Sequence, residues 1–307
     1  MTVISQPVEL KSDTGKVCLA IGMFDGVHLG HQQVLRQTIE DARQHGATAV
    51  AITFDRHPNA VVAPERNPPL IYTLAKKMRV IESLGVSSTL LIHFDQEFSR
   101  RSGADFIRGL AQGFGMITSI SVGSAFTFGH GRTGNVALLK KLGQDLGFVV
   151  HGLAAVSLDG KVVSSTRIRD AIRSGNLDAA SQMLGRAYAL IGRVLPGDQM
   201  GRQLGFPTAN LEIDGLSVPP NGVYAALAKV EKQSVQAVVN IGIRPTLRNP
   251  KPRLQVEAHL LDFAGDLYGR ELEVTFLQKL RDEREFPNRE ALAEQIQRDI
   301  LTAREIF

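Results

Sequence analysis

The feature that most constrains the fold is a change of pattern near Ala187. Before it, apolar runs of strand length alternate with stretches in which apolar residues recur every three or four positions, as on a helix with one buried face. Repeated strand–helix–strand units predict a doubly wound α/β domain, a mostly parallel sheet that helices cover on both faces and that binds ligands at the carboxyl ends of its strands. The predicted strands are KVCLAIGMF (16–24), ATAVAITF (47–54), SSTLLIHF (87–94), ITSISVG (117–123) and GFVVHGLAAV (147–156), and helical spacing covers 35–42, 74–81, 106–114 and 138–146, with stops near Gly46, Gly85 and Gly147.

After Ala187, short alternating runs are separated by Gly, Pro and Asn, and long helical patterns vanish until residues 288–306. Runs of this kind predict antiparallel strands in a small barrel or a sandwich. The chain is therefore expected to form two domains, over residues 1–185 and 186–307, the second closed by a C-terminal helix. The predicted strands of the second domain are NGVYAALAKV (221–230), VQAVVNIG (235–242), LQVEAHLLD (254–262) and ELEVTFLQKL (271–280).

Composition favours a cytoplasmic protein that handles small anions. Cys18 is the only cysteine, which excludes an intrachain disulfide and favours a reducing compartment. The start lacks a basic segment followed by an apolar run, and no apolar run reaches about 18 residues, so neither secretion nor a membrane segment is expected. The net charge of +4 is a mild basic excess, well short of the clustered Lys and Arg of a nucleic-acid binder. The oligomeric state stays open, a transient homo-oligomer included.

The first stretch with chemical content is GMFDGVHLGH (22–31), between a predicted strand and a predicted helix. Its three glycines let the backbone approach a ligand closely, and the N–H groups of a helix start can hold phosphate. His28 and His31 lie three positions apart on one face, where two imidazoles can hydrogen-bond phosphate oxygens as negative charge builds. Taken alone, the pair also fits a solvated helix start.

This turn resembles the HxGH signature of the nucleotidyltransferases that attack the α-phosphate of a nucleoside triphosphate. VVSSTRIRDAI (162–172) resembles their second motif, ISSTxIR. There, three hydroxyl residues can cap a helix that faces phosphate, and Arg167 offers a planar fork of donors. The resemblance implies His28 and His31 as catalytic residues. It implies ATP contacts at Gly22, Phe24, Asp25, Gly30, Ser164, Thr166 and Arg167.

The second stretch is GRVLPGDQMGRQLGFPTANLEI (192–213). Its glycines suit backbone N–H groups wrapped around phosphates, and Thr208 and Asn210 supply two neutral oxygens that could ligate Mg²⁺ beside a nucleotide. No lysine follows the glycines as in a P-loop. By composition alone the stretch is a turn-rich hairpin.

GRxLGFPTANL is similar to the ATP-binding motif of riboflavin kinases, and further stretches of that family follow in order. They are NGVYA (221–225), NIGIRPT (240–246), VEAHLLDFAGDLYG (256–269) and LRDEREF (280–286). With the HxGH domain, nearly the whole chain resembles the prokaryotic bifunctional riboflavin kinases/FMN adenylyltransferases (FAD synthetases). The resemblance implies riboflavin, FMN and ATP as substrates, FMN and FAD as products, and Mg²⁺ as cofactor. It implies ATP contacts at Gly201, Arg202, Thr208 and Asn210, with Mg²⁺ at the last two.

The resemblance also assigns Glu257 as the catalytic base and Arg281 as a flavin contact. Strand alternation supports the first assignment, because Leu254, Val256, Ala258 and Leu260 share one face and Glu257 must point away from them. A carboxylate so placed can accept the proton of the attacking ribityl hydroxyl. Arg281, followed by three acidic residues, fits a surface ion pair equally well.

The chain departs from the family pattern at two places. VGSAFTFG carries Ala125 where the family commonly has Asn or Asp, and Arg56 replaces the first proline of TFxPHPxxV. A methyl group cannot replace a polar contact worth about 1–3 kcal/mol, so adenylylation is expected to be weakened rather than abolished. The alternatives are a riboflavin kinase with an inactive first domain, and a flavin-binding regulator without turnover. The need for reduced flavin, the preferred metal and the reversibility of FAD formation stay open.

Overall fold

The computed structural model describes residues 1–10, 15–231, 233–246 and 249–307, and the side chains of 244–253 lie outside that description. For the last three residues of the NIGIRPT stretch, 244–246, the structure therefore describes the backbone but not the side chains. The chain divides into two compact units. The N-terminal unit comprises Met1–Arg167 with Met183–Gly185, and the C-terminal unit comprises Ile168–Gln182 with Arg186–Phe307.

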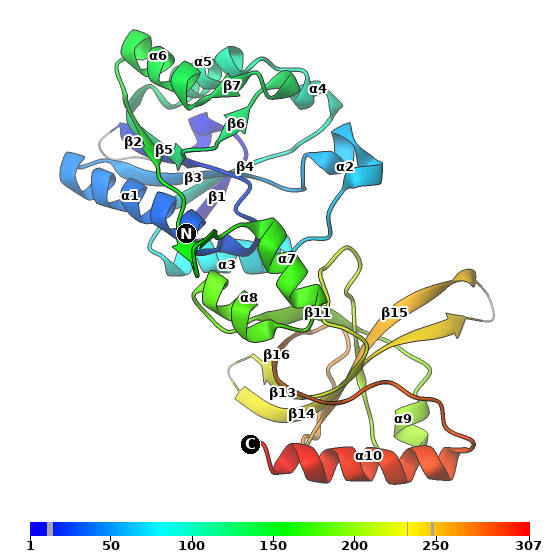
Figure 1. Cartoon of the computed structure of the whole chain (residues 1–307). Helices are drawn as coiled ribbons and strands as arrows, with labels where there is room; N and C mark the ends of the chain where they lie inside the picture. Colours follow the sequence, from blue (N-terminus) through cyan, green and yellow to red (C-terminus); the bar gives the residue numbers. More distant parts are fainter. Residues whose placement is uncertain (11–14, 232, 247–248) are drawn as a thin grey trace. The chain divides into compact units, whose positions relative to one another are not determined.

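The N-terminal unit is built on a six-stranded parallel sheet in the order β1-β4-β3-β2-β5-β8 (Figure 1). Five of the strands coincide with the predicted apolar runs, so the predicted doubly wound sheet is confirmed. The sixth, the three-residue edge strand β1, was not predicted. The strands are β1 (Thr2–Ile4), β2 (Lys16–Ile21), β3 (Thr48–Phe54), β4 (Ser88–Ile92), β5 (Met116–Gly123) and β8 (Val149–Leu153).

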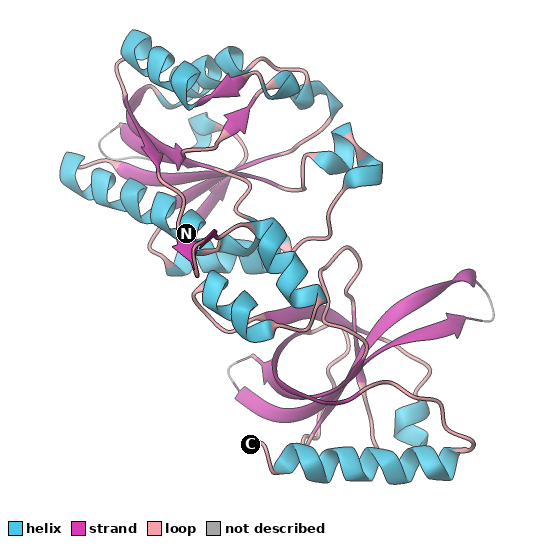
Figure 2. Cartoon of the chain, viewed as in Figure 1, coloured by secondary structure: helices cyan, strands magenta, loops and turns pink. Residues whose placement is uncertain are grey.

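Helices cover both faces of this sheet (Figure 2). Helix α1 packs on β2, β3 and β5, whereas α5 and α6 supply the main apolar core on the opposite face. Helices α1 and α6 end at glycines with positive φ, Gly46 (+60°) and Gly147 (+82°), as the sequence predicts. The helices of this unit are α1 (Leu29–His45), α2 (Asn59–Val62), α3 (Leu74–Ser83), α4 (Gln96–Ser99), α5 (Gly103–Phe114) and α6 (Val136–Leu146). Most of α7 (Ser165–Arg173) and α8 (Leu177–Leu184) belongs to the C-terminal unit.

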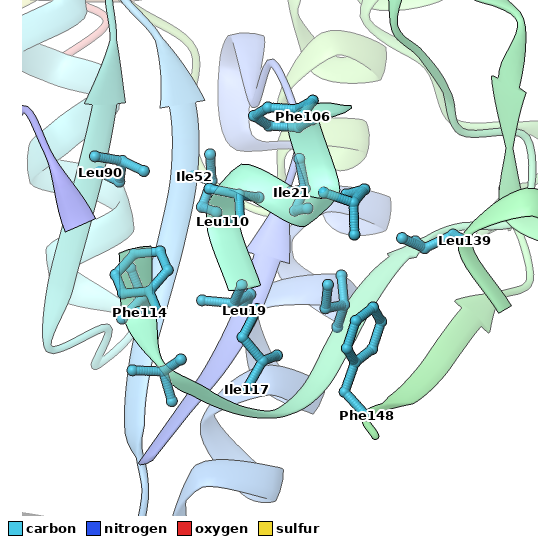
Figure 3. Packing of buried hydrophobic residues seen from close by; sticks show 14 of the residues in the cluster. Leu19, Ile21, Ile52, Leu90, Phe106, Leu110, Phe114, Ile117, Leu139 and Phe148 are labelled. Carbon is cyan, nitrogen blue, oxygen red and sulfur yellow. The ribbon is translucent and has the colours of Figure 1, made fainter. Parts of the chain in front are cut away.

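The main core lies between the sheet and helices α5 and α6 (Figure 3). Leu19 and Ile21 alternate with the residues of β2 that face the other side, and they meet Leu110 and Leu139 from the two helices. Each such side chain contributes about 1.5–3 kcal/mol when fully buried. This packing fixes the sheet, and with it the loops at the carboxyl ends of its strands.

Shorter elements lie on the loops of this unit. They include two small hairpins and four single turns of 3₁₀ helix. The hairpins are β6 (Thr127–Phe128) with β7 (Gly134–Asn135), and β9 (Ser157–Leu158) with β10 (Lys161–Val162); the 3₁₀ turns are η1 (Pro7–Glu9), η2 (Asp25–Val27), η3 (Pro64–Arg66) and η4 (His130–Arg132).

The C-terminal unit contains a closed antiparallel barrel in the order β11-β12-β15-β14-β13-β16. The barrel prediction is confirmed, and the sandwich alternative is wrong. The predicted C-terminal helix is α10, which begins after Asn288, whose side chain accepts from the Ala291 N–H at 2.8 Å. The elements are β11 (Ala189–Leu195), α9 (Met200–Gln203), β12 (Ala209–Leu211), β13 (Gly222–Val230), β14 (Gln233–Thr246), β15 (Asn249–Leu260), β16 (Glu271–Arg281) and α10 (Arg289–Arg304).

Among the helices of the described residues, none combines the length and the apolar character that crossing a membrane requires.

Candidate active sites

The N-terminal unit has a cavity of about 320 Å³ where the strand order of its sheet reverses. After β2 the chain adds β3 and β4 on one side, and then β5 and β8 on the other. Open α/β sheets bind ligands at this switch point, outside the carboxyl ends of the strands. The cavity walls come from the segments that follow β2, β5 and β8, from the start of α1, and from residues 162–164. The location agrees with the sequence prediction for this domain.

The turn between β2 and α1 has a strained backbone. Phe24 (φ +50°), Gly26 (φ +75°) and Val27 (φ +41°) are all left-handed, which a β-branched valine rarely adopts. Glycine suits position 26, because side chains rarely adopt its φ of +75° and a Cβ would also lie 2.9 Å from Cδ1 of the buried Ile71. Strain of this kind persists only where the surroundings hold it, and it concentrates at functional sites.

The two histidines of this turn lie side by side in the cavity wall. Their rings stack at a centroid distance of 3.6 Å with 18° between the planes, and the Phe24 ring meets His31 edge-on at 5.3 Å. His28 is the N-cap of α1, since its Nδ1 accepts from the His31 N–H at 3.4 Å. Gly30 leaves room for this arrangement, because a Cβ there would lie 3.2 Å from Cε1 of His28. Two imidazoles can therefore face one ligand oxygen.

Not all of the residues expected in this site line the cavity. Gly22, Phe24, Gly30 and Ser164 do, together with the histidines. Ser164 also caps α7, as expected, by accepting from the Arg167 N–H at 3.2 Å.

Asp25, Thr166 and Arg167 do not line it. The Asp25 carboxylate accepts from the Ile71 N–H at 2.9 Å and holds the strained turn from behind. The Arg167 guanidinium donates to the carbonyls of Leu158 (3.1 Å) and Lys161 (2.9 Å). Their side chains thus shape the site from outside its walls.

Lys77 of α3 lies next to this site and was not predicted from the sequence. It is 4% exposed, and burial lowers its pKa from 10.5 to about 8, against the opposing effect of the Asp25 and Asp55 carboxylates. Its Nζ donates to the carbonyls of Met23 (3.3 Å) and Phe54 (2.7 Å) and to Thr53 Oγ1 (3.1 Å). A sequence signal existed, because Lys77 stands three and four positions from Leu74 and Ile81, on the apolar face of the predicted helix.

Ala125 and Ser124 follow β5 and line the same cavity. The Ser124 N–H is engaged by the Leu153 carbonyl at 2.7 Å, so that backbone donor does not replace a missing side-chain amide.

Among the described residues of the C-terminal unit, Thr208 lines two neighbouring cavities. One, of about 280 Å³, includes Glu257, Gly201 and Arg281 in its walls and is bordered by Leu292 and Ile296 of α10. The other, of about 570 Å³, includes Arg202 and the loop over residues 263–268. Gly201 and Arg202 thus lie on opposite sides of Thr208, whereas the predicted ATP residue Asn210 lines neither of these two cavities.

Glu257 stands in the middle of a row across three strands. It pairs in register with Asn210 of β12 and with Asn240 of β14. Asn240 lines the same cavity as Glu257 and was not predicted. Val256 and Ala258 are buried, as the alternation predicts, whereas Leu254, near the open end of β15, is 37% exposed. The row places one asparagine on each side of the Glu257 carboxylate, on the two neighbouring strands.

The groups around Thr208 and Asn210 fit a magnesium ion. Both offer neutral oxygens, which Mg²⁺ accepts beside substrate phosphates. Gly201 makes room for the threonine, since a Cβ there would lie 3.2 Å from Thr208 Oγ1 and 2.5 Å from the Phe206 carbonyl. Gly197 does the same for Asn210, since a Cβ there would clash with Asn210 Nδ2.

Arg281 is held by α10 rather than by its acidic neighbours' side chains. Its Nε and Nη2 donate to the Asp299 carboxylate at 3.0 and 2.8 Å, and Nη1 donates to the Asp282 carbonyl at 3.0 Å. Its guanidinium lies 5.7 Å from the centroid of the Phe286 ring. Arg281, Asp299 and Phe286 all line the Glu257 cavity, so this ion pair fastens α10 to one wall of the site.

Known proteins match both units. A family model described as FAD synthetase matches residues 10–167, and one described as riboflavin kinase matches residues 184–307. The bifunctional riboflavin kinase/FMN adenylyltransferase of Pseudomonas fluorescens is 40% identical over 289 residues, which cover 94% of this chain and 92% of that protein. The protein of the same description from Escherichia coli K12 is 38% identical over 290 residues, with the same coverage.

A crystal structure of a Streptococcus pneumoniae protein described as a macrolide-efflux protein is similar over the whole chain. It has a TM-score of 0.82 and 27% sequence identity, and the match covers 98% of each chain. Both folds thus occur together in that protein.

Proposed function

Since the chain belongs to the family of bifunctional riboflavin kinases/FMN adenylyltransferases, we propose that its two units contain two separate reaction centres. The C-terminal barrel phosphorylates riboflavin to FMN with ATP, and the N-terminal unit adenylylates FMN to FAD and releases pyrophosphate. The observation that most supports two centres is that each unit has a cavity lined by residues suited to its reaction. Glu257 lines one cavity, and the stacked His28 and His31 line the other. Membership of this family does not favour the alternatives, which were a riboflavin kinase with an inactive first domain and a flavin-binding regulator without turnover.

In the N-terminal cavity, a phosphate oxygen of FMN attacks the α-phosphorus of ATP, and the bond to the β-phosphate oxygen breaks. Negative charge grows on the α-phosphate oxygens and on the departing pyrophosphate. We assign His28 and His31 to donate to these oxygens, because their rings present nitrogens side by side at the start of α1. Preorganised donors at developing charge are worth about 10²–10³ in rate each.

In the barrel, a ribityl hydroxyl oxygen of riboflavin attacks the γ-phosphorus of ATP, and ADP leaves. We assign Glu257 to accept the hydroxyl proton, with Asn210 and Asn240 beside it in register. Thr208 and Asn210 would hold Mg²⁺, which when bound neutralises charge on the β- and γ-phosphates. We place the flavin beside Arg281 and Phe286, which line the same cavity as Glu257.

Two matched variants test these assignments. Glu257→Gln keeps the shape of the side chain but removes the base, so FMN formation should fall about 10²–10⁴-fold while supplied FMN is still converted to FAD. His31→Ala should show the reverse, with FMN formed but little FAD. Chromatography of flavin products over time separates the outcomes, and the exposed Glu212→Gln is the control. Loss of both activities in either variant would contradict two separate centres.

The cellular compartment and the binding partners are also part of the proposal. The single buried cysteine, Cys18, agrees with a reducing compartment, and we propose the cytoplasm. We propose small-molecule partners and no nucleic acid, because the basic excess is small. A DNA or RNA affinity that falls steeply with salt would contradict the second point.

A further inference from the structure

Lys77 is buried behind the turn between β2 and α1, and each N–H of its ammonium group has an acceptor. Its ammonium has three N–H donors, and three acceptors surround it: the carbonyls of Met23 and Phe54, and the hydroxyl of Thr53. It does not line the cavity itself. A buried ammonium is costly, and a leucine or methionine would fill the same apolar face of α3 without that cost. The arrangement therefore contributes something other than packing.

What the network holds is one carbonyl of the turn. Met23 O accepts from Lys77 Nζ at 3.3 Å and from Thr53 Oγ1 at 3.0 Å. Thr53 is fully buried, so both donors are fixed. Because the peptide group is planar, fixing this carbonyl fixes the plane that joins Met23 to Phe24.

That plane also carries the N–H of Phe24. In a trans peptide the N–H points opposite to the C=O, and the described residues contain no cis peptide bond. The Phe24 N–H therefore points away from Lys77. Among the hydrogen bonds of the described residues, it donates to no protein acceptor. Met23 and Phe24 both line the cavity, so a ligand oxygen can supply the missing acceptor.

We propose that Lys77 is a positioning residue for FMN adenylylation: by holding the Met23 carbonyl, it aims the Phe24 N–H into the cavity, where this N–H donates to the phosphate chain of ATP. The proposal rests on the proposed function of the N-terminal cavity. Thr53 acts with Lys77, because its hydroxyl donates to the same Met23 carbonyl. Asp25, the residue after Phe24, is held in turn because its carboxylate accepts from the Ile71 N–H. The strained turn is thus fixed from two sides.

The test is Lys77→Met in the full chain, with Lys76→Met on the same helix as the control. A misplaced donor lowers kcat more than it weakens binding, so we expect kcat for FAD formation to fall about 10–100-fold while the Kd for ATP changes less than about threefold. Riboflavin phosphorylation by the same preparation should stay unchanged, which reports that the barrel is folded. Unchanged FAD formation in Lys77→Met would overturn the proposal.

A second pair of variants covers the case in which Lys77→Met unfolds the N-terminal unit. Thr53→Val removes one donor to Met23 O without changing the side-chain shape, and Thr53→Ser restores it. We expect kcat for FAD formation to fall about fivefold in Thr53→Val and to recover in Thr53→Ser. Equal kcat in the two would overturn the proposal. His31→Ala tests the proposed function of the cavity separately from the role of Lys77. If FAD formation survives in His31→Ala, the proposed function itself is contradicted.

Discussion

Replacing Asp299 with Asn should loosen α10 from the barrel. The Asp299 carboxylate is 5% exposed and takes two arms of Arg281 at 3.0 and 2.8 Å. Removing one partner of a buried ion pair costs about 3–5 kcal/mol. Here Arg281 keeps the Asp282 carbonyl and the Phe286 ring, and asparagine keeps one acceptor oxygen. We therefore expect Asp299→Asn to lower the free energy of unfolding of the barrel by about 2 kcal/mol.

A matched control is Asp262→Asn, because the partner of Asp262, Arg304, also belongs to α10. Arg304 of α10 donates to both oxygens of Asp262, at 2.9 and 2.7 Å, but the two side chains are 43% and 74% exposed. Exposed pairs contribute about 0–1 kcal/mol, and asparagine tolerates the φ of +55° at this position.

Riboflavin kinase activity across a urea series reports the barrel, and FMN adenylylation in the same sample reports the N-terminal unit. The kinase midpoint should fall by about 1 M in Asp299→Asn and by less than about 0.5 M in the control. Equal midpoint shifts in both variants would refute the burial reasoning.

Three further predictions concern single positions. Gly201→Ala places a Cβ 2.5 Å from the Phe206 carbonyl and should lower kcat/KM for ATP in the kinase reaction about 10–100-fold, without an effect on adenylylation of supplied FMN. Ala125→Asn should raise kcat/KM for FMN in adenylylation about five- to tenfold, as one gained hydrogen bond of about 1 kcal/mol predicts; a lower value would contradict it. Burial lowers the pKa of Lys77 to about 8 despite the Asp25 and Asp55 carboxylates facing it, so between pH 8 and pH 10 the unfolded chain holds a proton that the folded chain does not. Stability relative to Lys77→Met should therefore rise over this window by roughly 2 kcal/mol in urea titrations, and a fall would contradict the sign.

The layers of the fold were predictable because burial imposes a period on the sequence. The five long strands of the sheet and helix α10 follow from apolar runs and helical spacing. Strand β1 was not predicted, since three residues at a sheet edge carry no periodic signal. The short strand β12 and its pairing with β15 escaped for the same reason, although this pairing places Asn210 beside Glu257.

Within the sites, the sequence indicated neighbours along the chain but not contacts across it. His28 and Gly30 line the cavity as expected because their turn does. Asp25 belongs to the same turn, yet its carboxylate is used by Ile71, 46 positions away. Arg167 is likewise used by the β9–β10 hairpin, and Arg281 by Asp299 on α10. Such partners depend on tertiary packing, which local patterns do not encode.

The most direct test of two independent centres is to mix the Glu257→Gln and His31→Ala chains with riboflavin, ATP and magnesium. Each chain should fail alone, the first for lack of FMN and the second by stopping at FMN. Together they should form FAD after a lag in which free FMN accumulates, because each chain keeps one complete cavity. A mixture that forms FMN but no FAD would contradict the account.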